Sequence, residues 1–399
     1  MKHNFDRVID RRGTHCTQWD YVEDRFGVPD LLPFTISDMD IPSPPSILKA
    51  LESRVKHGIF GYTRWNHREF KGAVRRWFAR RFSADIDEDW IVYSPSVIYA
   101  CSKLIEMLSE EGDHIVVQTP AYDAFRPMVK ALRRRWVPNE LKYEKGRYGI
   151  DFADLEKKLA HPKAKILLWC SPHNPTGRVW RRWELEEMIR LCRKHRVFVI
   201  SDEIHMDIVY APFRHIPVTQ AAAGHLEGVF LCTSASKTFN TPGLGGSYAI
   251  LPNPDIRRRF LKAMKERDGL SSASIPGILA TIEGYNHAED WVDSLVEYLY
   301  GNMETVSSFL RRHLPEFQFS MPEATYLAWI DASRAPFTEE ALQEALIRRG
   351  KVAIMPGSVY GANTSSFLRM NVGCPRSKVL EGLKRMKTAV DQLRRHPGV

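Results

Sequence analysis

A single lysine, Lys237, follows a hydroxyl-rich turn that contains Ser234 and Ser236. The turn comes directly after residues 228–232, a short apolar run that predicts a buried strand. Small residues let a backbone approach a ligand closely, and hydroxyl groups with exposed N–H groups suit an anion such as phosphate. A lysine that is partly desolvated there can lose its proton and attack an aldehyde. A lone loop lysine is more often a plain surface side chain, so this interpretation depends on other residues of the chain.

The polar residues that could act with Lys237 follow predicted strands. From about residue 90 a pattern of strand, turn and helix repeats, which is typical of an α/β protein with a mostly parallel central sheet flanked by helices. Strands are expected at residues 90–93, 114–118, 165–170, 197–201 and 228–232, and the polar residues at or just after their ends are Ser96, Tyr122, Asn174, Asp202, His205 and Lys237. Because the carboxyl ends of such strands face one crevice, we expect these side chains to line one ligand site.

Ser96 also predicts an anion site. It is a suitable N-cap for a helix expected from residue 97 to about residue 110. The free N–H groups at the start of that helix favour a phosphate group.

Composition and length indicate an ordinary globular protein. The chain has 399 residues, of which 44% are hydrophobic and 26% are charged, so about two or three domains with a large core are expected. We predict an N-terminal segment, residues 1–50, that is irregular and packs with the small domain. A large domain is predicted for residues 51–285, and a small C-terminal domain for residues 286–399.

The small domain is predicted to be α+β. Apolar residues recur at helical spacing over residues 289–313, which predicts a helix with a core-facing side. Short strands are expected at residues 317–319, 325–330, 351–355 and 366–370, and two further helices near residues 338–349 and 376–395.

The net charge of +9 raises the question of a nucleic-acid partner. The arginine clusters at residues 133–135, 257–259 and 311–312 are short, dispersed and near the ends of helix-like segments. Cations are favoured there by the helix dipole and by water. We therefore interpret them as solvated faces and expect no nucleic-acid partner.

A cytoplasmic location without a membrane segment is also expected. The first residues lack the apolar core of a signal peptide, and no apolar run is long enough to span a membrane. The six cysteines are scattered and form no C-x-x-C pair, which favours reduced thiols. No metal is expected, because His205 and Asp207 have no further ligand cluster beside them.

A helix start for phosphate, an aromatic side chain, an asparagine and an aspartate around a lysine fit pyridoxal 5′-phosphate. That cofactor has a phosphate, a flat ring, a phenolic oxygen, a basic ring nitrogen and an aldehyde. Residues 171–177 (Ser-Pro-His-Asn-Pro-Thr-Gly), 201–205 (Ser-Asp-Glu-Ile-His) and 234–237 (Ser-Ala-Ser-Lys) follow at intervals of about thirty residues. In order and spacing they resemble the markers of the fold-type I, aspartate-aminotransferase-like superfamily. The resemblance implies that the large domain binds this cofactor.

A closer resemblance extends over nearly the whole chain, from about Phe5 to the last helix. Its segments are residues 16–20, 36–40, 61–65, 267–272 and 352–357. They look like the MalY/PatB branch, which comprises cystathionine β-lyases, also called cysteine-S-conjugate β-lyases.

The resemblance implies a role for each site residue. Lys237 bonds covalently to the cofactor's aldehyde, Asp202 pairs with the protonated ring nitrogen, Asn174 and His205 contact the phenolic oxygen, and Tyr122 stacks on the ring. Ser234, Ser236 and the backbone of Val97 and Ile98 hold the phosphate, and Tyr62 reaches the phosphate of the partner subunit in a homodimer. Arg369 binds the substrate carboxylate, with Asn174 and Asp38 as further substrate contacts, although Asp38 could equally be a structural turn acid.

One position departs from the wider superfamily. Many members have an arginine eight positions after the lysine that grips the phosphate, whereas this chain has Gly245. The phosphate is then expected to rely on hydroxyl groups, backbone N–H groups and Tyr62.

The implied reaction is α,β-elimination on a sulfur-bearing L-amino acid. Lys237 removes the Cα proton, a thiolate leaves from Cβ, and pyruvate and ammonia form; L-cystathionine would give homocysteine. An aminotransferase of small amino acids shares the residues and stays an alternative. A third alternative is a regulator of a transcription activator of the maltose system, because a member of this branch is associated with that role.

Overall fold

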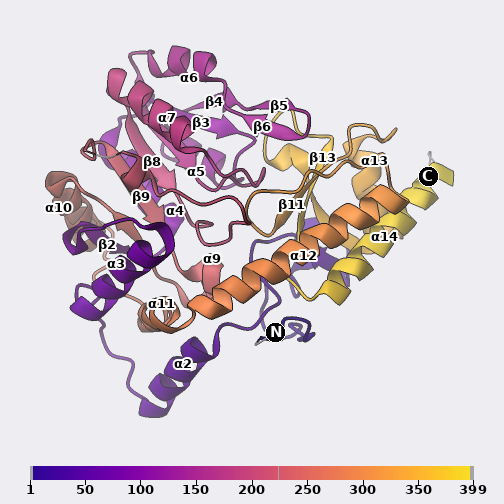
Figure 1. Cartoon of the computed structure of the whole chain (residues 1–399), viewed down its shortest axis with the longest axis horizontal. Helices are drawn as coiled ribbons and strands as arrows, with labels where there is room; N and C mark the ends of the chain where they lie inside the picture. The colour runs from indigo at the N-terminus through magenta and orange to yellow at the C-terminus, as the bar shows by residue number, and fades with distance from the viewer. Residues whose placement is uncertain (1–2, 223, 396–399) are drawn as a thin grey trace.

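The computed structural model describes residues 3–222 and 224–395 of the chain. Its central sheet is built from β2 (Ile91–Ser94), β3 (His114–Thr119), β4 (Arg135–Glu140), β7 (Ala164–Cys170), β8 (Phe198–Asp202), β9 (Val229–Thr233) and β10 (Ser247–Ile250). The strand order is β2–β10–β9–β8–β7–β3–β4 (Figure 1). Neighbours pair in parallel except at β10, which is antiparallel to both β9 and β2. The prediction of a mostly parallel α/β sheet is confirmed.

Helices cover both faces of this sheet. In β7, Ile166 and Leu168 join one buried apolar cluster, and Leu167 and Trp169 join the other. Successive side chains of a strand point to opposite faces, so a strand that is covered on both sides is apolar throughout. One cluster includes α4 (Val97–Leu108), α5 (Phe125–Ala131) and α10 (Pro254–Lys262); the other includes α3 (Arg68–Phe82), α6 (Phe152–Leu159), α7 (Arg182–Lys194), α8 (Val218–Ala221) and α11 (Ile275–His287).

A second, four-stranded sheet lies beside the C-terminal helices (Figure 1). Its strands are β1 (Leu32–Phe34), β12 (Val352–Pro356), β13 (Phe367–Asn371) and β11 (Leu327–Asp331), in that spatial order. The helices are α12 (Glu289–His313), α13 (Glu339–Glu344) continued by a π-helical turn at Ala345–Arg349, and α14 (Arg376–Arg395). The long α12 has the predicted bounds, which follow from its sustained apolar spacing.

One predicted strand of this region is wrong. Residues 317–319 form only an isolated bridge, in which Gln318 pairs with Asp331. The segment is too short to add a strand to the sheet edge, and Pro322, which has no N–H to donate, follows closely.

The N-terminal fifty residues are less irregular than predicted. They contain α1 (Val22–Phe26) and β1, and β1 pairs in parallel with β12. Pro33 is tolerated because β1 is an edge strand, where one missing N–H need not break the ladder. The next helix, α2 (Pro45–His57), extends away from both sheets (Figure 1). The division of the chain into three segments stays a prediction.

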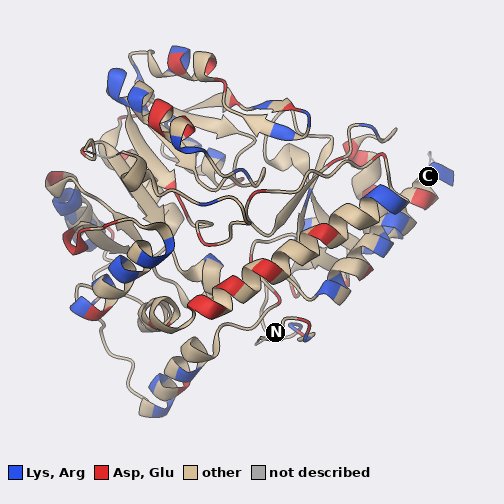
Figure 2. Ribbon diagram, viewed as in Figure 1, with Lys and Arg blue, Asp and Glu red and all other residues tan. Residues whose placement is uncertain are grey.

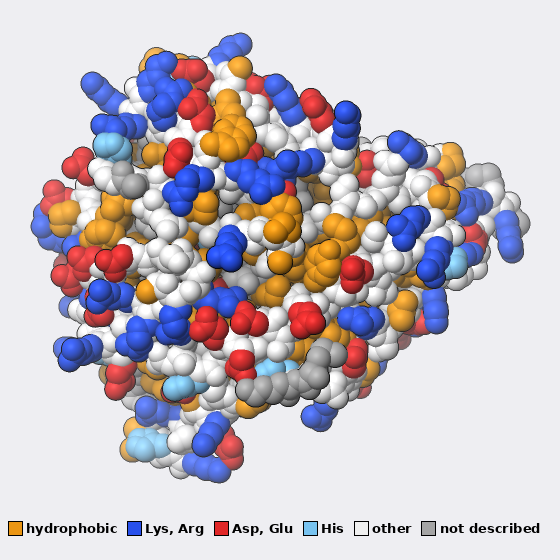
Figure 3. All heavy atoms as spheres, viewed as in Figure 1, with side chains coloured by type: hydrophobic (Ala, Val, Ile, Leu, Met, Phe, Trp, Pro, Cys, Tyr) orange, Lys and Arg blue, Asp and Glu red, His pale blue; other side chains and the backbone are white. Residues whose placement is uncertain are grey.

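Charged residues of both signs are interspersed over the helices (Figure 2). On the face shown in Figure 3, acidic and basic groups alternate with small apolar patches. Within residues 3–222 and 224–395, no helix combines the length and the apolar character needed to cross a membrane.

A buried cluster of ions joins the two parts of the fold. Arg178 is 4% exposed, and its guanidinium donates to the Glu184 carboxylate of α7 at 2.8 and 3.0 Å. It also donates to Glu323, which precedes β11, at 2.7 Å. The backbone N–H of Val179 donates to the same Glu323 oxygen at 2.8 Å. Each charge is therefore paired and hydrogen-bonded, which offsets the cost of its burial.

We predict that Arg178→Met lowers the free energy of unfolding by about 3–5 kcal/mol, because two carboxylates lose their shared cation in the interior. Urea unfolding followed by circular dichroism measures this loss. The matched control is Arg133→Met, which breaks a 3.3 Å pair with Glu111 between two exposed side chains and is expected to change stability little. Equal stability of the two variants would contradict the assigned role of the cluster.

Candidate active site

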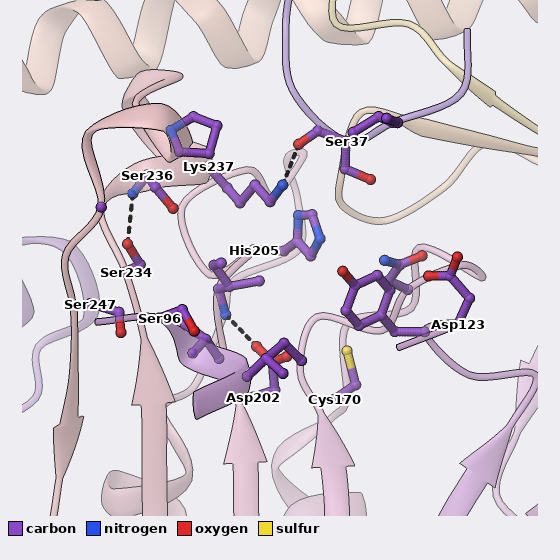
Figure 4. Close-up of a pocket in the computed structure, with 18 of the residues that line it drawn as sticks. Ser37, Ser96, Asp123, Cys170, Asp202, His205, Ser234, Ser236, Lys237 and Ser247 are labelled. Carbon is purple, nitrogen blue, oxygen red and sulfur yellow. Dashed lines mark hydrogen bonds between the residues drawn. The ribbon is translucent and has the colours of Figure 1, made fainter. Parts of the chain in front are cut away.

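A cavity of about 380 Å³ opens at the carboxyl ends of the central strands. All six polar residues that were predicted to gather at this edge line it: Ser96, Tyr122, Asn174, Asp202, His205 and Lys237. Asp202 is the last residue of β8, and Cys170, the last residue of β7, lies beside it at the cavity floor (Figure 4). The parallel sheet therefore brings side chains that are far apart in the sequence into one small volume.

Lys237 lies in the short helix α9 (Ser236–Phe239), directly after β9. Its Nζ donates to the backbone carbonyl oxygen of Ser37, from the N-terminal segment (Figure 4). Burial lowers the pKa of Lys237 to about 8, because the charged form loses its hydration. The negative charge of Asp38 acts in the opposite direction and raises the pKa of Lys237. A neutral amine, which is the nucleophilic form, is thus accessible near neutral pH.

Asp202 and His205 are both buried near this amine. Burial raises the pKa of Asp202 to about 7, and a hydrogen bond from the Ile204 backbone N–H to Oδ1, at 3.1 Å, partly opposes the shift. Burial also lowers the pKa of His205 to about 3, so its imidazole is neutral. The Nδ1 of His205 has no hydrogen-bond partner in the described residues. Both groups are thus prepared for a polar ligand in the cavity.

A serine-rich end of the cavity can receive an anion. Ser96 caps α4, accepting from the Tyr99 backbone N–H at 3.1 Å, and Val97 and Ile98 at the helix start also line the cavity. Ser234, Ser236 and Ser247 line the same cavity, and Figure 4 shows Ser96, Ser234 and Ser247 on one side of it. Hydroxyl groups at the start of a twelve-residue helix favour a phosphate.

Close backbone packing shapes this end. Gly245 and Gly246 have φ angles of +69° and +92°, which favour glycine. A Cβ on Gly277, in α11, would lie 2.2 Å from the Gly245 carbonyl oxygen. The start of α11 and the turn at Gly245 and Gly246 therefore pack together only because Gly277 has no side chain. The residue at position 245 is glycine and not the arginine found in many members of the superfamily.

Arg369 enters the cavity from β13 of the second sheet. Its guanidinium donates to the Thr35 carbonyl at 2.7 Å and to the Asn174 Oδ1 at 3.3 Å. The ring of Tyr360 lies under it, with 4.6 Å from Cζ to the ring centroid. Within the described chain, its Nε is buried without a hydrogen-bond partner. A carboxylate ligand would satisfy this donor.

Two predicted residues lie elsewhere. Asp38 does not line the cavity, and its Oδ2 pairs with the Arg11 guanidinium at 2.7 Å. Tyr62 is 99% exposed on the segment between α2 and α3. Their roles toward substrate and phosphate stay predictions.

Several other residues that line the cavity were not identified from the sequence, among them Arg25, Asp123 and Ser247. Asp123 could have been found, since it directly follows Tyr122. Ser247 starts β10, a strand that was not predicted. Arg25 belongs to the five-residue α1, and no pattern in the sequence places that helix near the strands.

Similarity to known proteins extends over the whole fold. Residues 29–386 match the family model described as aminotransferase class I and II. The chain is 46% identical over 391 residues to Protein MalY of Escherichia coli (strain K12), with 98% of this chain and 100% of MalY covered. It is 37% identical over 387 residues to Cystathionine beta-lyase PatB of Bacillus subtilis (strain 168), with 97% and 100% covered.

The structure agrees with these relationships. It resembles the crystal structure of cystalysin from Treponema denticola, which contains a pyridoxal 5′-phosphate cofactor, with a TM-score of 0.93 and 30% identity. The match covers 98% of this chain and 100% of cystalysin. The chain therefore belongs to the aminotransferase class I and II family, which has the fold-type I architecture, and within it to the MalY/PatB branch.

Proposed function

We propose that the chain is a pyridoxal 5′-phosphate-dependent carbon–sulfur β-lyase, which cleaves S-substituted L-cysteines such as L-cystathionine to pyruvate, ammonia and a thiol. The observation that carries this proposal is the partly buried Lys237 amine, which shares one cavity with the buried Asp202 carboxyl group and the Arg369 guanidinium. The name of PatB, cystathionine beta-lyase, supports the same reaction.

The donor set of the cavity fits this cofactor. The serines and the α4 start suit its phosphate. The pKa of about 7 for Asp202 reflects burial, which the Ile204 N–H and the charge of Lys237 oppose only in part; a protonated ring nitrogen beside it would favour the ionised carboxylate. Asn174 and the unpaired Nδ1 of His205 are available to a phenolic oxygen. Tyr122 lines the cavity, and its aromatic ring is available to stack on the ring of the cofactor.

When bound, the cofactor supplies an aldehyde that takes up amines and a ring that accepts the electron pair left at Cα. The protein's residues orient the substrate and move the proton. Arg369 binds the substrate carboxylate in a guanidinium fork that Thr35 and Asn174 hold in place. Lys237, as a neutral amine, then removes the Cα proton. Apolar side chains, among them Ile36 and Ile204, also line the cavity, and the lower local polarity strengthens the electrostatic contacts of both residues.

An aminotransferase needs the same residues, and its reaction differs only after the Cα proton has been lost. We expect the purified protein to form pyruvate and homocysteine from L-cystathionine with no oxo-acid acceptor present. A coupled pyruvate assay and a thiol assay measure both products. Strict dependence on an added oxo acid would instead identify an aminotransferase.

We predict that Lys237→Ala lowers the rate of pyruvate formation by roughly 10²–10⁴-fold or more, because the amine serves as the general base. Borohydride reduction of the wild-type protein, followed by peptide mapping, should label Lys237. The exposed Lys262, 71% accessible in its side chain, provides the control substitution, Lys262→Ala. A label on any other residue would contradict the assignment.

The lowered pKa of Lys237 predicts a pH dependence. The amine of the cofactor-free protein is protonated below a pH of about 8 and neutral above it, and only the neutral form attacks an aldehyde. The rate of reaction with added pyridoxal phosphate, followed by stopped-flow absorbance, should therefore rise through pH 8 and then level off. A free lysine, with a pKa of about 10.4, is the control. A rate that still rises steeply above pH 9 would contradict the prediction.

We also infer a homodimer in which Tyr62 reaches the phosphate site of the partner subunit. Tyr62 is almost fully exposed, and the nearby apolar side chains Ile59 and Phe60 are exposed as well. A cluster of exposed apolar side chains supports a subunit interface at this loop.

A cytoplasmic location and a transcription-regulator partner stay predictions. All six cysteines are free and buried, which supports the expectation of reduced thiols. The regulator role rests on the resemblance alone.

A further inference from the structure

Two charged side chains that line the cavity have no part in the proposed reaction. Arg25 comes from α1, and Asp123 lies between β3 and α5. Figure 4 shows Asp123 on the side of the cavity opposite Ser96 and Ser234. The pair therefore lies at the end of the cavity away from the serines, where a ligand extends beyond the reacting atoms.

The two groups face each other without a hydrogen bond. Nη2 of Arg25 lies 3.9 Å from Oδ2 of Asp123, which is longer than an N–H···O hydrogen bond of about 2.7–3.2 Å. Their side chains are 46% and 29% exposed. The structural ion pair of Arg178 and Glu184 differs, because its atoms lie 2.8 Å apart and both side chains are buried. Arg25 and Asp123 both keep hydrogen-bonding capacity for a ligand.

Tyr360 does not line this cavity, but it lines the adjoining one together with Asp123. It is 3% exposed, and its hydroxyl has no hydrogen-bond partner within the described residues. Its ring packs against Arg369. Burial raises the pKa of Tyr360, and the charges of Arg25 and Asp123 also act on it. Tyr360 therefore connects the loose pair, through Asp123 in the adjoining cavity, with the Arg369 guanidinium.

We propose that Arg25 and Asp123 form a subsite for the leaving thiol, which selects S-substituted cysteines whose thiol end carries both a carboxylate and an ammonium group. Arg25 receives the carboxylate in its fork, and Asp123 accepts from the ammonium group. This assignment rests on the proposed lyase function. L-Cystathionine has such a zwitterionic end, whereas S-alkyl cysteines do not.

Four substrates that share the Cβ–S bond distinguish the contribution of the carboxylate from that of the ammonium group. S-Ethyl-L-cysteine has an uncharged thiol end, S-(2-carboxyethyl)-L-cysteine has only the carboxylate, S-(2-aminoethyl)-L-cysteine has only the ammonium group, and L-cystathionine has both. The variants are Arg25→Met and Asp123→Asn, and the control is Arg133→Met on the distant surface. All are assayed as holoenzymes, and each kcat/KM is divided by that of S-ethyl-L-cysteine for the same protein.

We expect crossed effects. Arg25→Met lowers the ratio for the carboxyethyl substrate by roughly five- to tenfold, the size of a partly exposed charged contact, and does not lower it for the aminoethyl substrate. Asp123→Asn lowers the ratio for the aminoethyl substrate by a similar factor and does not lower it for the carboxyethyl substrate. Both variants lower the ratio for L-cystathionine, and Arg133→Met changes none of them.

Binding gives a second measurement. In the Lys237→Ala background, where turnover is blocked, Arg25→Met should raise the Kd of L-cystathionine in calorimetry by a similar factor, relative to that of S-ethyl-L-cysteine. Ratios that stay constant, or that change equally for all charged substrates in both variants, would overturn the subsite. If the wild-type protein forms no pyruvate from any of the four, the lyase function itself fails instead.

Discussion

The irregular segment of residues 35–39 has backbone carbonyl groups that need hydrogen-bond donors in the interior, and the site is built from the side chains that supply them. The Thr35 carbonyl accepts from Arg369 at 2.7 Å. The carbonyls of Ile36 and Asp38 both accept from Asn371, at 2.5 and 2.6 Å. Arg369 and Asn371 belong to β13 of the second sheet, so one strand and one irregular segment fix each other's position. The N-terminal segment is thereby as much a part of the site as the central sheet.

Ion pairs also anchor the chain at Asp40, directly after this segment. Asp40 accepts from Arg11 at 2.9 Å and from Lys378 of α14 at 2.5 Å, and the Trp19 indole N–H donates to it at 3.0 Å. Burial acts to raise the pKa of Asp40, but Lys378 and these donors hold it below its usual range. The carboxylate therefore stays ionised, and its stabilising contribution is lost only when the pH falls through that lowered pKa. Segments at both ends of the chain meet at this one carboxylate.

The sequence predicted the parts whose signals are local or repeated. Helix α12 was found with its bounds because its apolar spacing persists over 25 residues. The site residues after strands were found because parallel topology forces strand ends to one edge. Strand β1 was missed because it contains Pro33 and becomes a strand only by pairing with β12. Arg25 was missed for the same reason: α1 reaches the cavity through long-range packing, which leaves no pattern in a five-residue helix.

The Ser37 carbonyl explains how the partly buried Lys237 can be held in place and still be free to react. It accepts both from Lys237 and from the Tyr326 hydroxyl, the latter at 2.8 Å. When Lys237 turns toward a ligand, Tyr326 still satisfies this carbonyl, so no buried acceptor is left without a partner. Burial raises the pKa of Tyr326, which keeps its hydroxyl protonated as a donor. For the neutral amine, the cost of release is then limited to one hydrogen bond between uncharged groups, about 0.5–1.5 kcal/mol.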